Sequence, residues 1–370
     1  MTTITLDHIS KSFQRETVIG VGTADATQAV DNVSLKIISG DVLAVLGPSG
    51  CGKSTLLRLI AGLLKPDSGH ILYDNVDIEQ VPLSERGIGM VFQDNALIPH
   101  WEARRSVGFF LSLRRREHEV PERLLRISKI TGIGLDQLLA RRPSQLSGGE
   151  QQRVAIARAL ARDLRILLFD EPFANIDAKL RTESRGELKR LLNEFPVTAV
   201  YVTHDQSEAV ALSHRVAVMR AGRLEQVGTY QQLYDNPINV FVATFIGTPT
   251  INLFSGKVRG GRWWGENFGG FAIRGDLAEG SAVMLGIRPD GIHLHSKDTA
   301  GITPAVVDGV TPFFAERYQL IEVHLAGEHW ALTVPYLSSE QRISAGETVY
   351  CTLDPTNALY FDGETGHRIG

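Results

Sequence analysis

The fold of this chain follows from one stretch, Gly47-Pro48-Ser49-Gly50-Cys51-Gly52-Lys53-Ser54-Thr55. This stretch has the G-x-x-x-x-G-K-[ST] pattern of a phosphate-binding P-loop. The apolar run 42–46 before it predicts a fully buried parallel strand, and residues 56–62 after it predict a helix that ends at Gly62. A chance glycine-rich turn is the competing interpretation. The order strand, glycine loop, helix favours the P-loop, because it is the context that such a loop requires.

The residue types of this loop suit a nucleotide. Its glycines let the backbone curl so that successive N–H groups point at phosphate oxygens, and the helix N-terminus adds the positive end of its dipole. Lys53 can bring a full positive charge to the β- and γ-phosphates, and the Ser54 hydroxyl is placed to ligate Mg²⁺. We therefore predict that the nucleotide contacts Ser49, Gly50, Cys51, Gly52, Lys53, Ser54 and Thr55.

Length and composition set the wider frame. A chain of 370 residues is long enough for more than one domain. The net charge of −4 gives no general affinity for nucleic acid. The two cysteines lie far apart in sequence, which favours a reducing compartment. No apolar run reaches the about 18 residues that a membrane span needs, so other chains would supply any membrane part.

The order of the expected elements predicts an α/β sheet with a helical insertion. Segment 101–149 has a helical texture and carries several arginines, which we interpret as a solvated helix face. Strands and helices alternate before and after this segment, as in a mainly parallel sheet. Strands are expected at 6–13, 30–38, 71–73, 89–92, 166–169 and 198–203, with a loop at 19–25.

The C-terminal third has a different pattern. After Asn236-Pro237, short strands with alternating apolar residues follow one another, as at 321–325, 330–334 and 349–353. Such alternation at short intervals predicts a small β-barrel or sandwich. We therefore expect two domains, an α/β domain over 1–236 with its helical part at about 94–160, and an all-β domain over 237–370.

Polar residues follow the predicted strands. Asp170 comes directly after a buried strand, where an acidic residue can hold Mg²⁺, and Glu171 is placed to deprotonate an attacking water. Gln93 follows a strand and can contact Mg²⁺ and water, although an ordinary exposed glutamine would look the same. His204 follows another strand, where it is either a site residue or a core histidine.

A third segment, Leu146-Ser147-Gly148-Gly149-Glu150, opens a predicted helix that runs to about Arg162. Ser147 and Glu150 have the spacing of a capping box, in which each side chain accepts a hydrogen bond from the other residue's backbone N–H.

The order of these motifs resembles an ATP-binding-cassette ATPase, the nucleotide-binding subunit of a transporter. The Leu-Ser-Gly-Gly-Glu segment is highly specific to that family. The matching segments are Gly47 to Thr55, Val91-Phe92-Gln93, Leu146 to Gln151, Leu168-Phe169-Asp170-Glu171-Pro172, Asn175-Ile176-Asp177 and Val202-Thr203-His204-Asp205.

The resemblance implies a role for each site residue. In this family ATP lies between two cassettes, so Ser147, Gly148 and Gly149 of one copy would face the γ-phosphate held by Lys53 of the other. It also implies that Gln93 senses Mg²⁺ and the membrane partner, that His204 contacts the γ-phosphate and that Asp177 links the two sites. Phe13 falls where the family places an aromatic side chain on adenine, and a strand-end core aromatic is the alternative.

The resemblance extends through the C-terminal domain. Segments 228–249 and Gly286-Ile287-Arg288-Pro289-Asp290 resemble maltose-importer-type ATPases, whose P-loop NTPase core, with its helical and antiparallel β-subdomains, precedes an OB-like regulatory barrel. It implies an ATP- and Mg²⁺-dependent homodimer that works on the cytoplasmic face of the membrane. Two permease subunits and, indirectly, an extracytoplasmic solute-binding protein would be its partners.

The solute is left open by the sequence. The resemblance implies import of a carbohydrate or related polyol, and neighbouring branches carry polyamine, sulfate or iron. A soluble cassette ATPase that acts on nucleic acid is a further alternative, because OB-like barrels can bind oligonucleotides. The acidic charge balance argues against it, and we expect no nucleic-acid partner.

Overall fold

The computed structural model describes residues 1–14, 26–131, 135–174, 176–195, 197–266, 268–273, 277–295, 303–314, 316–325, 327–336, 343–353 and 357–369. The expected loop at 19–25 and Asn175 lie outside these residues. The chain divides into two compact units, Met1–Tyr230 and Gln231–Gly370. Each unit is described by itself below.

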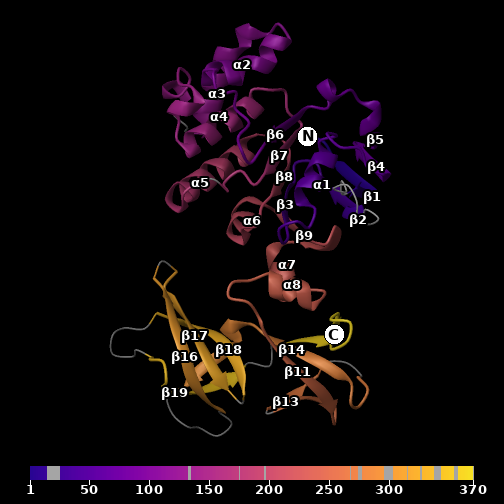
Figure 1. Cartoon of the computed structure of the whole chain (residues 1–370), viewed down its shortest axis with the longest axis vertical. Coiled ribbons are helices and arrows are strands. Elements are labelled where there is room, and N and C mark those ends of the chain that lie inside the picture. Colours follow the sequence, from indigo (N-terminus) through magenta and orange to yellow (C-terminus); the bar gives the residue numbers. More distant parts are fainter. Residues whose placement is uncertain are drawn as a thin grey trace, which may run out of the picture. The chain divides into compact units, whose positions relative to one another are not determined.

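A six-stranded sheet forms the centre of the N-terminal unit (Figure 1). Its spatial order is β10-β9-β3-β8-β7-β6, with parallel pairing from β9 through β6 and an antiparallel β10 at the edge. The α/β prediction is therefore confirmed. The strands are β3 (Val42–Leu46), β6 (Ile88–Val91), β7 (Ile166–Asp170), β8 (Thr198–Val202), β9 (Arg215–Arg220) and β10 (Arg223–Gly228).

The central strands are continuously apolar because both of their faces are covered. Along β7, Leu167 and Phe169 pack in one hydrophobic core with the helices of segment 103–212. Ile166 and Leu168 point the other way, into a second core with α1 (Lys53–Ile60) and the antiparallel strands. All four side chains are fully buried, as expected for a parallel strand with both faces covered.

The second core is closed by a four-stranded antiparallel sheet of order β2-β1-β4-β5. The two early strands predicted from the sequence are present and longer than expected, because β1 and β2 pair as far as Gln14 and Ala26. The sheet contains β1 (Ile4–Gln14), β2 (Ala26–Ile37), β4 (Ser68–Tyr73) and β5 (Val76–Asp77).

Helices cover the opposite face of the central sheet, and α2, α3 and α4 lie together beyond its β6 edge (Figure 1). They are α2 (Ala103–Leu113), α3 (Val120–Thr131), α4 (Gly148–Leu160), α5 (Ala178–Glu194) and α6 (Gln206–Leu212). Short 3-10 turns are η1 (Ile78–Gln80), η2 (Leu83–Glu85), η3 (Glu117–Glu119), η4 (Leu135–Gln137), η5 (Pro143–Gln145) and, in the C-terminal unit, η6 (Pro289–Gly291). Among the helices described, none is long and apolar enough to cross a membrane.

The arginines of segment 101–149 do more than form a solvated face. Arg114 and Arg115 are exposed, whereas Arg116 is half-buried and binds both Glu119 and Asp163. Arg123 adds a second bridge to each of these carboxylates, at 2.7 Å in both cases. The hydrogen bond from Arg116 is the main cause that lowers the pKa of Glu119 to about 2. The network ties α3 to the end of α4.

In its described residues the C-terminal unit is mainly β-structure, as predicted, and two short helices that were not predicted precede the strands. One sheet has the order β13-β12-β11-β14-β20-β21 and the other β15-β19-β16-β17-β18, with antiparallel pairing throughout. The elements are α7 (Tyr230–Asp235), α8 (Val240–Phe245), β11 (Asn252–Arg259), β12 (Arg262–Gly265), β13 (Gly269–Ala272), β14 (Ala282–Ile287), β15 (Ile292–His295), β16 (Thr303–Phe313), β17 (Tyr318–Leu325), β18 (Glu328–Pro335), β19 (Thr348–Leu353), β20 (Leu359–Asp362) and β21 (Arg368–Ile369).

The two sheets share one core. Phe254 of β11 contacts Trp330 of β18, with ring centroids 4.6 Å apart, and the buried Trp263 packs in the same cluster. The buried Asn252 also joins the sheets, because its amide donates to Ile287 O and Ala331 O at 3.1 and 2.8 Å. The alternating pattern of 321–325 arises here, since Ile321 and Val323 point into this core.

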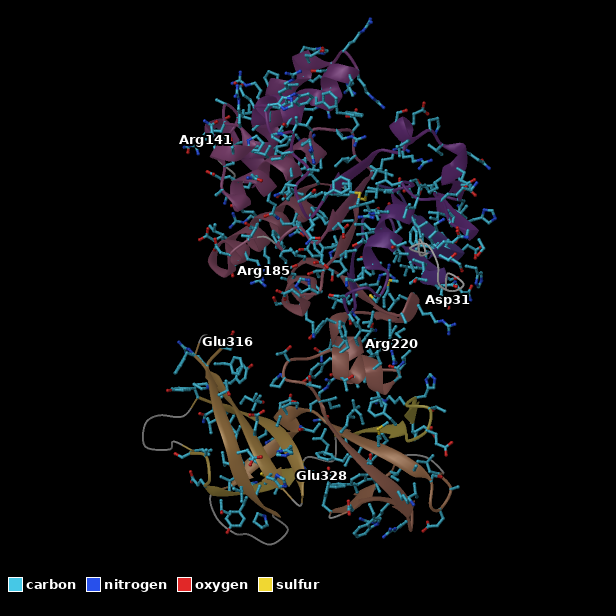
Figure 2. The ribbon with its side chains drawn as sticks, viewed as in Figure 1. Asp31, Arg141, Arg185, Arg220, Glu316 and Glu328 are labelled. Carbon is cyan, nitrogen blue, oxygen red and sulfur yellow. The ribbon has the colours of Figure 1, made fainter. Side chains whose placement is uncertain are left out.

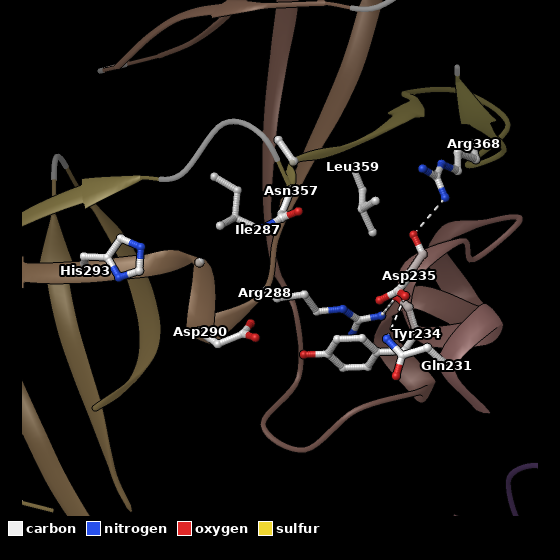
Figure 3. Close-up of a pocket in the computed structure, with 12 residues that line it drawn as sticks. Gln231, Tyr234, Asp235, Ile287, Arg288, Asp290, His293, Asn357, Leu359 and Arg368 are labelled. Atoms are coloured by element: carbon white, nitrogen blue, oxygen red, sulfur yellow. Dashed lines mark hydrogen bonds between the residues drawn. The ribbon is translucent and has the colours of Figure 1, made fainter. Parts of the chain in front are cut away.

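Arg288 explains the Gly-Ile-Arg-Pro-Asp motif in structural terms (Figure 3). Its guanidinium is buried over the ring of Tyr234, 4.0 Å from the centroid. It donates to the carbonyl oxygens of Ala243 and Ile246 at 2.9 and 2.6 Å, and to Tyr234 O at 2.8 Å. These carbonyls belong to α7 and to the end of α8, so Arg288 holds both helices to β14. It also lines a pocket of about 520 Å³.

We expect Arg288→Ala to lower the free energy of unfolding of the C-terminal unit by about 3 kcal/mol, because it leaves two buried carbonyls and one partly buried carbonyl without their charged donor. Arg288→Lys should lose less, since lysine keeps the charge but not the fork of donors. Urea unfolding followed by tryptophan fluorescence measures both. Arg259→Ala is the matched control, because that side chain is exposed. Equal stability of Arg288→Ala and Arg259→Ala would contradict this account.

Candidate active site

Four neighbouring strands bring the predicted site residues to one edge of the central sheet. In spatial order these are β3, β8, β7 and β6, and all four run parallel. Their carboxyl ends lead into the P-loop, His204, Asp170-Glu171 and Gln93, respectively. Ligands bind at the carboxyl ends of the strands in open α/β sheets. The topology therefore places residues from four separate sequence segments at one possible ligand site.

The P-loop needs its glycines for steric reasons. Gly52 has φ +105°, and a Cβ there would lie 2.0 Å from Ala29 O of β2. A Cβ on Gly47 would lie 2.4 Å from Met219 O of β9. Larger residues at these positions would push the loop away from its neighbouring strands. Gly52 is also the N-cap of α1 and has no side chain to bond the first N–H groups of the helix, which leaves them for an anion.

Lys53 is buried and folded back over this loop. Its Nζ donates to Gly47 O at 2.8 Å and to Pro48 O at 3.0 Å. Both of these partners are neutral carbonyls. The ammonium charge can therefore gain a stronger, charge-assisted interaction from a phosphate placed in the loop.

Ser54 of the P-loop and Asp170 at the end of β7 are in direct contact, as a shared metal site would require. The Ser54 hydroxyl donates to Asp170 Oδ1 at 2.8 Å, across 116 residues of sequence. Asp170 is buried at the end of β7. A hydroxyl and a carboxylate side by side supply the oxygen ligands that Mg²⁺ prefers, so these two residues fit the predicted metal.

Glu171 and His204 form the second contact of the site. Glu171 Oε2 lies 3.0 Å from His204 Nδ1, and the two side chains are 21% and 61% exposed. Glu171 has φ +43°, which is uncommon for a residue with a side chain. Its backbone N–H donates to Val202 O at 3.0 Å and holds this turn. The left-handed turn directs the carboxylate across the end of β8 toward His204.

A buried carboxylate beneath this turn was missed by the sequence analysis. Glu208 Oε2 accepts hydrogen bonds from the hydroxyls of Tyr201 and Thr203 at 2.8 and 2.7 Å. Burial raises the pKa of Glu208. Thr203 Oγ1 also accepts from the Asp205 N–H at 3.0 Å, so this network fixes the residues on both sides of His204. No local pattern in the sequence indicates this burial, because the partners of Glu208 are set by the packing of α6 against β8.

Gln93 lies at the same edge of the sheet. It is exposed and stands two residues beyond Val91, which pairs with Phe169 of β7. Continuing this register places Gln93 level with Glu171. Its exposed side chain fits both interpretations that the sequence left open, a contact with Mg²⁺ and water or an ordinary surface glutamine.

The Leu-Ser-Gly-Gly-Glu segment forms the predicted capping box at the start of α4. Ser147 N–H donates to Glu150 Oε2 at 2.8 Å, and Glu150 N–H donates to Ser147 Oγ at 3.3 Å. Ser147 and Gly148 are exposed. Arg141, which projects outward in Figure 2, lies 3.4 Å from the Glu150 carboxylate. Within the described part of the chain, no hydrogen bond joins 147–149 to the P-loop.

Asp177 has a local role that the sequence analysis did not assign. It is the N-cap of α5, where its carboxylate accepts a hydrogen bond from the Leu180 N–H at 3.0 Å. The residue is exposed, so a neighbouring chain could also reach it.

Phe13 is on the surface beside the P-loop. Its side chain is 42% exposed, so it is not a core aromatic. Phe13 pairs with Thr27 of β2, two residues before the Ala29 that lies against Gly52. The ammonium of Lys11 lies 5.9 Å from its ring centroid. An exposed aromatic ring at this position is able to stack on a base.

The fold and this site define a P-loop ATPase. A family model described as ABC transporter matches residues 30–174. The chain is 40% identical over 351 residues to the sn-glycerol-3-phosphate import ATP-binding protein UgpC of Escherichia coli O157:H7, covering 93% of this chain and 96% of the relative. The corresponding protein of strain K12 is 39% identical over 350 residues with the same coverage. The chain therefore belongs to the family of ABC transporter ATP-binding subunits and binds ATP.

Solved structures agree with this assignment. The bacterial ABC transporter cassette MJ0796, solved as a dimer, is 34% identical, with a TM-score of 0.54. The match covers 61% of this chain and 98% of that cassette. A second dimeric structure of MJ0796, in a post-hydrolysis state with bound ADP and Pi, has a TM-score of 0.53.

Proposed function

We propose that this chain is the ATP-hydrolysing subunit of an importer for glycerol phosphate or a related polyol or carbohydrate. The observation that carries the proposal is the convergence of Lys53, the Ser54–Asp170 pair and the Glu171–His204 pair at one edge of the sheet. The class of solute rests on the function for which the relatives are named, and these relatives match nearly the whole chain.

The site residues have separate tasks in hydrolysis. Lys53 exchanges its two loop carbonyls for the β- and γ-phosphates. Ser54, Asp170 and Gln93 would hold Mg²⁺, which neutralises phosphate charge when bound. Glu171 accepts a proton from the water that attacks the γ-phosphorus, while the bond from that phosphorus to the β–γ bridging oxygen breaks and ADP leaves. His204 beside Glu171 contacts a γ-phosphate oxygen.

The site is completed by a second copy of the chain. Ser147 is the N-cap of the 13-residue helix α4, which Gly148 and Gly149 begin, and Ser147 and Gly148 are exposed. The N-terminus of such a helix is a suitable contact for a γ-phosphate. These three residues make no hydrogen bond to the P-loop of their own chain among the residues described. We therefore assign them to the nucleotide of the partner copy, with Asp177 at the contact between copies and Phe13 on the adenine.

Two permease subunits at the cytoplasmic face of the membrane would receive the energy of this cycle, and a solute-binding protein would deliver the solute to them. The subunit itself would attach peripherally. Gln93, at the exposed edge of the site, is the residue that we assign to coupling between hydrolysis and the permeases.

Reconstitution tests this function. The full chain, its co-purifying membrane subunits and their solute-binding protein are placed in proteoliposomes, and phosphate release and uptake are measured with glycerol 3-phosphate, maltose or a polyamine. We expect glycerol 3-phosphate or a carbohydrate to stimulate ATP hydrolysis and to accumulate inside. Stimulation by the polyamine alone would overturn the solute class, and co-purification with nucleic acid in place of membrane proteins would overturn the importer.

A further inference from the structure

Three polar side chains from different strands meet on the outer face of the five-stranded sheet. They are Asp308 of β16, His324 of β17 and His329 of β18. The neighbours of each in sequence, Val307, Val323 and Trp330, point into the core. Because side chains alternate along a strand, the three polar residues point away from that core.

Their contacts are close. His324 and His329 are directly opposite each other in the β17–β18 register, and their ring centroids are 4.5 Å apart. His329 Nδ1 lies 3.0 Å from Asp308 Oδ2. One ligand atom from each residue lies within 4.8 Å of the other two.

A bulge brings the carboxylate into this group. Val307 pairs with Val323 and Gly309 pairs with Glu322, so Asp308 is an extra residue with no residue opposite. Bulges of this kind change the direction of a side chain and recur beside functional sites. Here the change places Asp308 next to a histidine two strands away.

We propose that Asp308, His324 and His329 form a binding site for a divalent transition-metal ion of the Zn²⁺ class. Two imidazoles and one carboxylate are a ligand set for such ions, whereas Mg²⁺ and Ca²⁺ select oxygen ligands. Ligand atoms in a tetrahedral site with bonds of about 2.0 Å are roughly 3.3 Å apart. The 3.0 Å between His329 Nδ1 and Asp308 Oδ2 is near this value. Water completes the coordination.

An ordinary surface ion pair is the competing explanation. It accounts for Asp308 and His329, and exposed pairs of this kind contribute little to stability. The ion pair does not explain why His324 lies beside His329. A bound metal ion uses all three residues and links three strands of the sheet.

The test uses the full-length chain without a histidine tag, stripped with a chelator and titrated with Zn²⁺ and, for its visible absorption, with Co²⁺. We expect one equivalent to bind at this site. His324→Ala, His329→Ala and Asp308→Asn should each weaken that equivalent by at least about 10–100-fold. His295→Ala is the matched control, since His295 is an exposed histidine whose ring Nε2 lies 2.8 Å from the Thr352 hydroxyl, in a different pair of strands.

Circular dichroism in chelator verifies that each variant is folded, as expected for exposed positions. Loss of the Co²⁺ absorption in the three variants and its retention in His295→Ala would support the site. Failure of the wild-type chain to bind either ion, or equal binding by all four variants, would overturn the proposal. The same titration is independent of ATP hydrolysis, so it stands apart from the proposed function.

Discussion

Glu171→Gln is expected to bind ATP and to hydrolyse it about 10²–10⁴-fold more slowly than the wild-type chain. Glutamine has nearly the same shape as glutamate and can still bond to His204, 3.0 Å away. Glutamine cannot accept the proton of the attacking water. The substitution should therefore lower the rate of ATP hydrolysis and leave the affinity for ATP unchanged. Steady-state phosphate release and the affinity for a fluorescent ATP analogue measure the two effects separately.

The matched control for this change is Glu79→Gln. Glu79 forms a surface pair with Lys65, in which the side chains are 50% and 75% exposed. We expect this variant to hydrolyse ATP at the wild-type rate. If Glu171→Gln also does so, Glu171 is not the base.

Lys53→Ala and Ser147→Arg should each lose about 10²–10³-fold in ATP hydrolysis, the range for removal of one charge-stabilising group. Lys53→Ala removes the ammonium that faces the loop carbonyls, and it should also weaken ATP binding. Ser147→Arg places a bulky charged side chain at an exposed helix start. It should leave the P-loop of its own chain able to bind ATP.

Two further variants separate these effects from local damage. Ser147→Ala removes the same capping oxygen as Ser147→Arg, at a cost of about 1 kcal/mol of helix stability, without the added bulk. It should retain most of the activity. Lys65→Ala removes a lysine whose side chain is 75% exposed. This variant should hydrolyse ATP at the wild-type rate. Equal loss in Ser147→Ala and Ser147→Arg would show that capping alone explains the result.

Local rules were sufficient for much of this fold. The P-loop strand and helix and the capping box of Ser147 and Glu150 depend on residues close together in sequence, and all are present. The alternation at 321–325 predicted a strand with one buried face, and Ile321 and Val323 are buried. These predictions needed only periodicity, capping and turn chemistry.

Contacts between distant segments could not be predicted in this way. Arg288 looked like part of a family motif, and only the folded chain shows that it binds the carbonyls of two helices. The buried Glu208 depends on the packing of α6 against β8. The meeting of Asp308 with the two histidines depends on the register of three strands and on one bulge. Such registers are set by tertiary pairing, which no short window of sequence contains.

The central claim is that two copies of this chain share each ATP site, and co-expression of the Lys53→Ala and Ser147→Arg chains tests it most directly. Each variant alone should hydrolyse ATP about 10²–10³-fold more slowly than the wild-type chain. If the two chains pair at random, half of the dimers contain one chain of each kind, and each of these mixed dimers has one intact site out of two. The co-expressed sample should therefore regain up to about a quarter of the wild-type rate. A co-expressed sample no more active than either variant alone, or a variant that hydrolyses ATP normally by itself, would contradict the shared site.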